Sequence, residues 1–281
     1  MELTKKIHLL HIDFEITISP DVKIPRFVNS IIIFGKNITL IDTGVKGSEE
    51  KIFEYIEQNG RKKSELKTII LSHAHPDHIG SAAKIKKITD CRVFAHKDEV
   101  EWIENINLQN EQRPVPGFFN LVDQSVTVDK KLYNGQVLKV DDDITLDIIH
   151  APGHSKGSIN IFFKEDQILF TADSIPLKND IPNYDDFKDL MRSLKRMLNN
   201  SNYKTLLTSW TPPIYNLDAI EKLIQDGKNY MRRIDTIVKS EYENIPEAEP
   251  LSCCKKTIEK LGLPPVLVNP IVDKAFRSHL G

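Results

Sequence analysis

The chain has few cysteines and lacks a long apolar run, and each shortage excludes a class of protein. Its 281 residues contain three cysteines, Cys91, Cys253 and Cys254. An odd count with a vicinal pair makes a poor disulfide framework. No apolar stretch is long enough to span a membrane, and the opening residues lack the apolar core of a signal peptide. We therefore expect a cytoplasmic protein with no membrane segment.

An excess of charge of either sign is also missing. Lys and Arg number 38 against 40 Asp and Glu, which gives a formal net charge of -2. Proteins that bind nucleic acid normally carry a clear basic excess, so we expect no nucleic acid partner. Hydrophobic residues make up 40% and charged residues 28% of the chain. This composition is typical of a globular protein with a packed core, in one large domain or two modest ones.

Only nine histidines occur in the chain, and three of them lie in one short run. The run is His73-Ala74-His75-Pro76-Asp77-His78. Imidazole and carboxylate groups are ligands of zinc, iron and manganese ions. The apolar residues 68–71 predict a strand before the run, and we expect Pro76 to prevent a helix through it. Because loops at strand ends often carry functional residues, we predict that His73, His75, Asp77 and His78 bind metal.

Further candidate ligands follow other predicted strands. His154 comes after the apolar residues 144–149, and Pro152-Gly153 predicts a turn that can hold its side chain in one orientation. Asp173 ends the next apolar run. Asp42 ends an earlier strand and could orient a ligand histidine from behind, although a plain Asp-Thr-Gly turn explains it nearly as well. We therefore expect His154 and Asp173 to join the histidine run at one site.

Periodicity and capping residues predict the remaining elements. Strands are predicted at 12–18, 66–71, 91–95 and 204–207, and hairpins at 31–41, 137–149 and 158–171. Helices are predicted at 48–59 with Ser48 as N-cap, near Ile79, and at 97–103, 184–199, 217–243, 252–261 and 269–280 with Asn269 as N-cap. Residues 105–125 show no periodicity, so we expect a loop there, either a lid over the site or an ordinary connector.

Four motifs together resemble the metallo-β-lactamase fold superfamily. They are NSIIIFGKNITLIDTG (29–44), HAHPDHIG (73–80), APGHSKGS (151–158) and TADS (171–174). The resemblance covers about residues 5–215. It implies an α/β fold, an αββα sandwich of two mixed β-sheets with helices outside. Residues 1–216 would form this domain, and residues 217–281 would form a C-terminal helical extension packed on it.

The resemblance also implies a two-metal site. His73, His75 and His154 would bind a first divalent ion, Asp77 and His78 a second, and Asp173 would bridge them. Zinc is favoured over iron and manganese. Two such ions lower the pKa of a shared water and produce hydroxide at neutral pH. Asp77 could orient this nucleophile or take its proton, so it is also the predicted catalytic residue.

This chemistry predicts a hydrolase. Asp173 in place of cysteine and the lack of room for a large inserted domain argue against the antibiotic-degrading and nucleic-acid-processing branches. The small-molecule branch remains, which includes glyoxalase II and lactonases. We therefore predict attack by a metal-bound hydroxide on a small ester-like substrate, which is a thioester, lactone or phosphoester. A homodimer is an open option, and the C-terminal helices would shape the cleft or a dimer contact.

One residue departs from the family pattern. The family usually supplies another histidine to the second metal just after the last strand, where this chain has Trp210. Indole has no lone pair for a metal, so the second ion would lose one protein ligand and, unless another group compensates, would be bound weakly. Water, substrate or His279 could compensate, but a surface position at a helix end is the better prediction for His279. We expect a structural role for His96.

Two alternatives to the predicted hydrolase remain. They are a mononuclear iron dioxygenase of the persulfide-oxidising type and a non-catalytic metal-binding protein.

Overall fold

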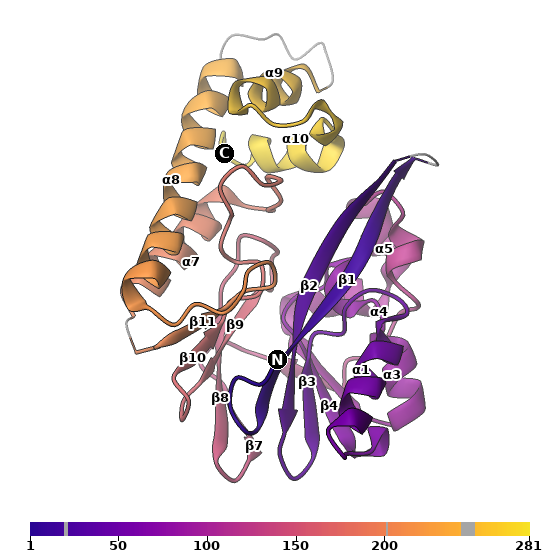
Figure 1. Ribbon diagram of the computed structural model, residues 1–281. Helices are drawn as coiled ribbons and strands as arrows, with labels where there is room; N and C mark the ends of the chain where they lie inside the picture. The colour runs from indigo at the N-terminus through magenta and orange to yellow at the C-terminus, as the bar shows by residue number, and fades with distance from the viewer. Residues whose placement is uncertain (20–21, 201, 243–250) are drawn as a thin grey trace.

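A computed structural model describes residues 1–19, 22–200, 202–242 and 251–281. Two β-sheets face each other, with helices on both outer sides (Figure 1). The first sheet has the order β1-β2-β3-β4-β5-β6 and the second β11-β10-β9-β8-β7. This arrangement confirms the predicted αββα sandwich.

Both sheets are mixed, as expected. In the first sheet, β1 (Ile7–Ser19), β2 (Val22–Phe34) and β3 (Ile38–Ile41) are antiparallel neighbours. The strands β3, β4 (Leu66–Leu71), β5 (Arg92–His96) and β6 (Lys130–Leu132) run parallel. In the second sheet, β7 (Val137–Asp141), β8 (Ile144–His150), β9 (Ile159–Phe163) and β10 (Ile168–Phe170) are antiparallel, and β11 (Thr205–Leu207) pairs parallel to β10.

The alternation of side chains along the strands explains the layers. Ile31 and Ile33 of β2 face the second sheet, whereas Ile32 between them faces the helices. In β4, Ile70 likewise faces the second sheet, and Ile69 faces the helices. Successive residues of a strand point to opposite faces, and a sheet covered on both faces needs apolar residues at every position. The continuous apolar runs of the sequence are therefore strands buried between two layers.

Short helices cover the first sheet. They are α1 (Ser48–Gln58), α2 (Pro76–Ile79), α3 (Ala82–Thr89), α4 (Val100–Glu104), α5 (Ile106–Gln112) and α6 (Phe118–Leu121). Two expectations about their starts were wrong. Gly47, with φ at 90°, is the N-cap of α1, and Ser48 is its first residue. Pro76 begins α2 instead of excluding a helix, because proline fits the first helical position, where no backbone N–H bond is needed.

Helices from the C-terminal part of the chain pack against the second sheet. The helix α7 (Phe187–Leu198) and the helix α8 (Leu217–Tyr242) pack beside each other, and α9 (Ser252–Leu261) and α10 (Pro270–Arg277) continue from α8 (Figure 1). Their apolar faces form one core cluster with Leu169 and Leu206 of the second sheet. The Asn269 side chain accepts the N–H groups of Ile271 and Val272, which confirms the predicted cap of α10.

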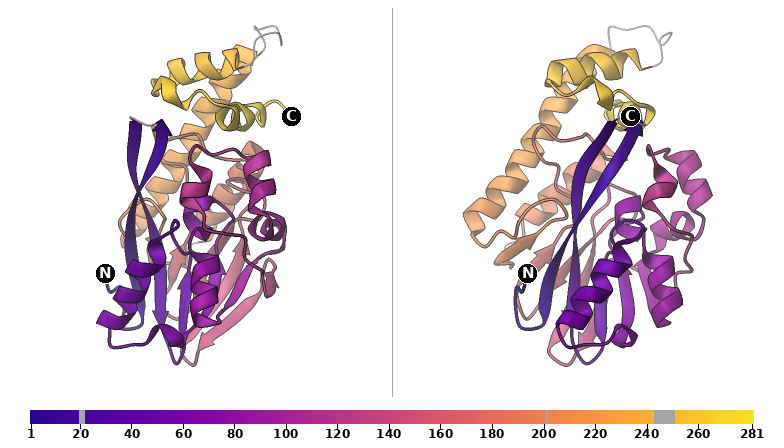
Figure 2. Two further views of the ribbon diagram at one scale, coloured as in Figure 1. Left: turned by 90° about the vertical axis from the view of Figure 1, so that its right-hand side faces the viewer. Right: turned by 45° about the vertical axis from the view of Figure 1, so that its right-hand side comes forward.

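The β1–β2 hairpin extends well beyond the rest of its sheet, on the side of the molecule where α9 and α10 lie (Figure 2). The prediction of a strand at 12–18 was right but too short, since β1 begins at Ile7. Among the residues that the structure describes, no helix is both long and apolar enough to cross a membrane.

Candidate metal centre

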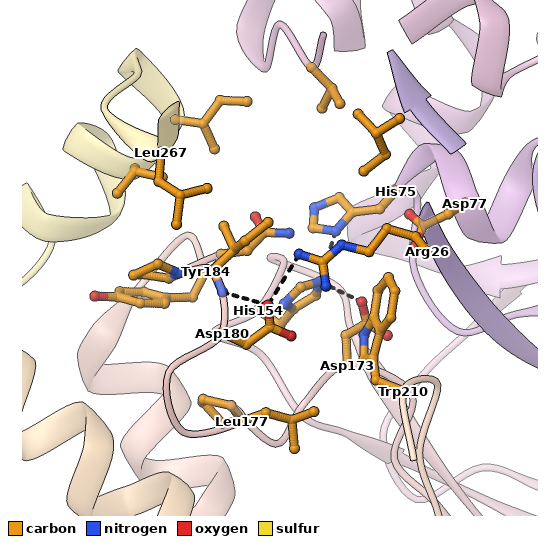
Figure 3. A pocket seen from close by; sticks show the side chains of 18 of the residues that line it. Arg26, His75, Asp77, His154, Asp173, Leu177, Asp180, Tyr184, Trp210 and Leu267 are labelled. Carbon is orange, nitrogen blue, oxygen red and sulfur yellow. Dashed lines mark hydrogen bonds and ion pairs between the residues drawn. The ribbon is translucent and has the colours of Figure 1, made fainter. Parts of the chain in front are cut away.

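The predicted ligand residues come together where strands of both sheets end. The run from His73 to His78 follows β4, and His154 follows β8. Asp173 follows β10. The side chains of His75, Asp77, His154 and Asp173 face one another at this edge (Figure 3). Residues about 100 positions apart along the chain therefore form one cluster.

Three imidazoles form the first group. His73, His75 and His154 are buried, and their ligand atoms all lie within 4.8 Å of one another. Nε2 of His154 is 2.8 Å from Nδ1 of His75. Nε2 of His73 is buried and has no hydrogen-bond partner among the described residues. Converging imidazoles of this kind fit a divalent ion with nitrogen ligands.

Asp173 joins this group to a second one. Its Oδ2 lies 3.4 Å from Nε2 of His154 and 3.9 Å from Nε2 of His73. Its Oδ1 lies 3.3 Å from Nε2 of His78. Asp77 is also present, with Oδ2 at 3.5 Å from the same nitrogen of His78. The two carboxylate oxygens of Asp173 thus point to different histidine groups, as a bridging ligand would require.

The electrostatics of the cluster also fit metal ions. Burial lowers the pKa of His73 and His75 well below the ordinary value, and it lowers the pKa of His154 to about 4. These rings are neutral at pH 7, as metal ligands must be. Burial alone would lower the pKa of His78 too, but the carboxylates of Asp173 and Asp77 raise it overall. This half of the cluster therefore attracts positive charge.

Asp42 supports two of the histidines from behind, as was one option at the sequence level. Its Oδ2 lies 2.9 Å from Nδ1 of His78 and accepts the Ser72 hydroxyl at 2.7 Å. The Ser72 hydroxyl is in turn 3.0 Å from Nδ1 of His73. A carboxylate on the far nitrogen of a histidine fixes the orientation of the ring and the nitrogen that faces the metal. The plain-turn alternative does not explain these contacts.

Glu99 is a buried residue of the site that the sequence did not reveal. It is 2% exposed, and its carboxylate accepts the backbone N–H of Ala74 at 2.8 Å and the Ser155 hydroxyl at 2.7 Å. The backbone N–H of Gly157 is its third donor. Burial raises its pKa to about 7, against the effect of these hydrogen bonds. Glu99 therefore ties the loop of His73 and His75 to the loop of His154.

Gly153 is needed for the turn that presents His154. Its φ of +131° is rare for residues with a side chain, and an added Cβ would lie 2.3 Å from Cα of Leu190 in α7. The sequence predicted this turn from Pro152-Gly153, but it gave no sign that α7 closes over the turn.

A cavity of about 240 Å³ opens next to the cluster (Figure 3). The segment 105–125 contributes Arg113, Val115, Pro116 and Leu121 to its walls. Lining the cavity is compatible with a lid and with an ordinary connector, and the segment contains the helices α5 and α6, so it is not a loop throughout. The C-terminal helical region contributes Leu267 and its neighbours, which agrees with the expected role in shaping the cleft.

Trp210 lies in the same cavity wall as Asp77 and Asp173. It follows β11, at the position where the family histidine was expected. His279 does not replace that histidine. The prediction of a surface position for His279 was wrong, since it is 3% exposed, with Nε2 at 2.7 Å from the Tyr184 hydroxyl and Nδ1 at 3.0 Å from Asp235. Both of its nitrogens are therefore already engaged.

The exchange Trp210→His tests whether the group formed by Asp77, His78 and Asp173 lacks one metal ligand. We expect the variant to bind its second equivalent of zinc about tenfold more tightly or better, because an imidazole adds a lone pair that indole lacks. Titration with zinc against a competing chelator measures this. Trp210→Phe is the matched control, since it also removes the indole but adds no ligand. Equal zinc affinity in both variants would show that residue 210 does not face the second group.

A second group, His96, Asp98 and His150, also has ligand atoms within 4.8 Å of one another, but its ring arrangement is less suited to a metal ion. His96 and His150 stack at 4.2 Å between ring centroids with an interplanar angle of 12°. Lone pairs in the planes of parallel rings do not converge on one point, and Nε2 of His150 is 3.0 Å from the Lys156 carbonyl oxygen. This stack links β5 to β8, which agrees with the structural role expected for His96.

The comparisons with known proteins agree with this geometry. A family model described as the metallo-beta-lactamase superfamily matches residues 24–212. The hydroxyacylglutathione hydrolase GloC of Haemophilus influenzae is 28% identical over 140 residues, which are 49% of this chain and 61% of that protein. A probable metallo-hydrolase of Methanocaldococcus jannaschii is 29% identical over 52% of this chain and 66% of its own length. The chain thus spans about two thirds of these relatives or less.

Solved structures share the fold at low identity. A metallo-beta-lactamase family protein from Thermus thermophilus aligns with a TM-score of 0.76 over 99% of this chain and 93% of that one, at 18% identity. A beta-lactamase domain protein from Burkholderia ambifaria aligns with a TM-score of 0.70 over 100% and 86%, at 15% identity. Both alignments include the C-terminal helices, so the whole described chain follows a known architecture.

Proposed function

Since this chain belongs to the metallo-beta-lactamase superfamily, we propose that it is a metal-dependent hydrolase of a small ester-like substrate, which is a thioester, lactone or phosphoester. The observation that carries the proposal is the convergence of His73, His75, His154 and Asp173 beside a cavity. Neutral, buried imidazoles with an unpaired nitrogen have the chemistry of metal ligands. The similarity to a hydroxyacylglutathione hydrolase supports a thioester among the substrates.

The residues of the chain have separate tasks in this proposal. His73, His75 and His154 would hold a first divalent ion, for which we propose zinc, and Asp77, His78 and Asp173 would hold a second one more weakly. Ions bound there would lower the pKa of water and polarise the ester group. Asp77 is the candidate acceptor for the proton of the attacking water, because it lines the cavity and burial raises the pKa of its carboxyl.

The test is hydrolysis before and after removal of metal. The purified protein is treated with a chelator, and zinc, manganese or iron is then returned. A hydroxyacylglutathione thioester, an acyl lactone and a phosphodiester serve as probes. We expect at least one probe to be hydrolysed, hydrolysis to stop with the chelator, and zinc or manganese to restore it. Hydrolysis that survives complete removal of metal would contradict the proposal.

Trp210 favours one competing function, since a mononuclear site needs no ligand at that position. A persulfide-oxidising iron dioxygenase would consume oxygen when iron and a persulfide are supplied, and it would hydrolyse none of the probes. A protein that folds without metal uptake and acts on neither kind of substrate would exclude both enzymes. The cytoplasmic location expected from the sequence stays a prediction, and a homodimer stays an open option.

A further inference from the structure

The cavity contains a buried arginine that has no anionic partner among the described residues. Arg113 is 5% exposed and lines the cavity with His75 and Asp77. Its guanidinium donates to the side-chain oxygen of Asn183, and its Nε is buried without a partner. The carboxylates of Asp185, Asp77, Asp173 and Glu99 all act on its charge, Asp185 most strongly, but none of them forms an ion pair with it within 4.0 Å among the described residues. A buried cation with an unused donor is costly unless an anion joins it.

The other arginine of the cavity is already paired. Arg26 from β2 lies 3.2 Å from Asp180, and its guanidinium is 6.0 Å from the ring centroid of Trp210 (Figure 3). It is also partly open to solvent. Arg113 is thus the cavity arginine with unused capacity for a ligand. Arg113 belongs to the segment 105–125, and its hydrogen bond to the Asn183 side chain holds its charge close to the metal centre.

Much of the cavity lining beyond the two arginines is apolar. In Figure 3, Leu177 and Leu267 lie on the side of the cavity away from Asp77 and Trp210. Other apolar side chains that line the cavity come from β1, β2, the loop before α7 and the C-terminal region, among them Phe14, Ile24, Ile175, Ile181, Val266 and Ile271. Such a wall binds hydrocarbon through loss of apolar surface to water.

We propose that Arg113 recognises an anionic group of the substrate, and that the substrate is an ester-like molecule with this anion near the scissile bond and an aliphatic part against the apolar wall. That the substrate is an ester rests on the proposed hydrolase function. The anion site does not depend on that function, because it is inferred from Arg113. Hydrolysis adds one water across the ester bond and releases an acid and an alcohol or thiol, so no oxidant or reductant is required. A charge-assisted hydrogen bond to guanidinium supplies the selectivity.

Ligand binding tests the anion site without hydrolysis. Octanesulfonate carries a negative group that coordinates metals weakly, and octanol has the same chain without charge. We expect the wild-type protein to bind octanesulfonate about tenfold more tightly than octanol or better. In Arg113→Gln this preference should disappear, and in Arg113→Lys it should partly remain. Arg92→Gln, at an exposed position of β5, removes one charge elsewhere and should keep the preference. Isothermal titration calorimetry gives the affinities.

Kinetics then test the role in the reaction. Nitrophenyl hydrogen succinate and nitrophenyl butyrate have the same leaving group and chain length, and the succinate alone is charged. Arg113→Gln should lower kcat/KM for the succinate about tenfold more than for the butyrate, with the extra loss mainly in KM. Equal losses for both esters would overturn the proposal, because Arg113 would then act on the centre itself and not on a substrate anion.

The failures of the two proposals are distinguishable. Loss of preference for the sulfonate in Arg113→Gln supports the anion site even if no ester is hydrolysed, in which case only the hydrolase function fails. If wild-type protein binds octanol and octanesulfonate equally, the anion site is wrong whatever the hydrolytic activity. This wild-type comparison also decides the question if Arg113→Gln does not fold.

Discussion

Replacing Asp173 with alanine should remove the bound metal and lower kcat/KM for any hydrolysed ester by more than about a thousandfold. Asp173 is the residue that lies within 4 Å of histidines from both groups, with its oxygens at 3.3 Å from His78, 3.4 Å from His154 and 3.9 Å from His73. Its loss removes the negative charge between three histidines. It also removes a ligand from each group. Elemental analysis and ester hydrolysis measure both effects.

Asp98→Ala is the matched control for this variant. Asp98 also lies beside two histidines, His96 and His150, but their rings are stacked and the group lies outside the proposed catalytic centre. Metal content and hydrolysis should therefore stay at the wild-type level. Full metal content in Asp173→Ala, with its fold intact by circular dichroism, would contradict the account of the site.

Glu99→Ala should lower the free energy of unfolding by about 3–5 kcal/mol and weaken metal binding about tenfold or more. The change leaves the N–H groups of Ala74 and Gly157 and the hydroxyl of Ser155 buried without their acceptor. Each lost acceptor costs about 1–3 kcal/mol, and neighbouring losses are not additive. The loops that carry His75 and His154 would also lose their common anchor. Urea unfolding and metal titration measure the two effects.

Glu101→Ala separates this role from a general effect of charge. Glu101 is an exposed residue in the first turn of α4, the helix that Glu99 precedes as N-cap, and a surface exchange there should change stability by less than about 0.5 kcal/mol. If Glu99→Ala is as stable and binds metal as tightly as Glu101→Ala, the carboxylate of Glu99 does not hold the two loops.

The sequence predicted the layers of the fold because they follow from local patterns. The apolar runs that form β2, β3 and β4 are buried on both faces, and the hairpins at 137–149 and 158–171 contain β7–β8 and β9–β10. The motif order also indicated which strand ends meet. The positions of His73, His75, His154 and Asp173 relative to one another agree with that expectation.

The residues that were missed act through contacts far along the chain. Glu99 reaches Ala74 and Ser155, 25 and 56 positions away, and Arg113 reaches Asn183, 70 positions away. No periodicity marks such contacts, so a glutamate at the start of a short helix and an arginine in an irregular segment both have the pattern of surface residues. His279 was misjudged for the same reason, because its partners Tyr184 and Asp235 come from distant segments.

The central claim is that His73, His75 and His154, with Asp173, bind a catalytic metal ion. Elemental analysis of the purified wild-type chain and of His154→Ala tests it most directly. We predict about one to two divalent ions per chain in the wild type, with zinc the main element, and a large loss of metal in His154→Ala that parallels the loss of hydrolysis. A wild-type chain that is folded and hydrolyses esters with no bound metal would contradict the claim.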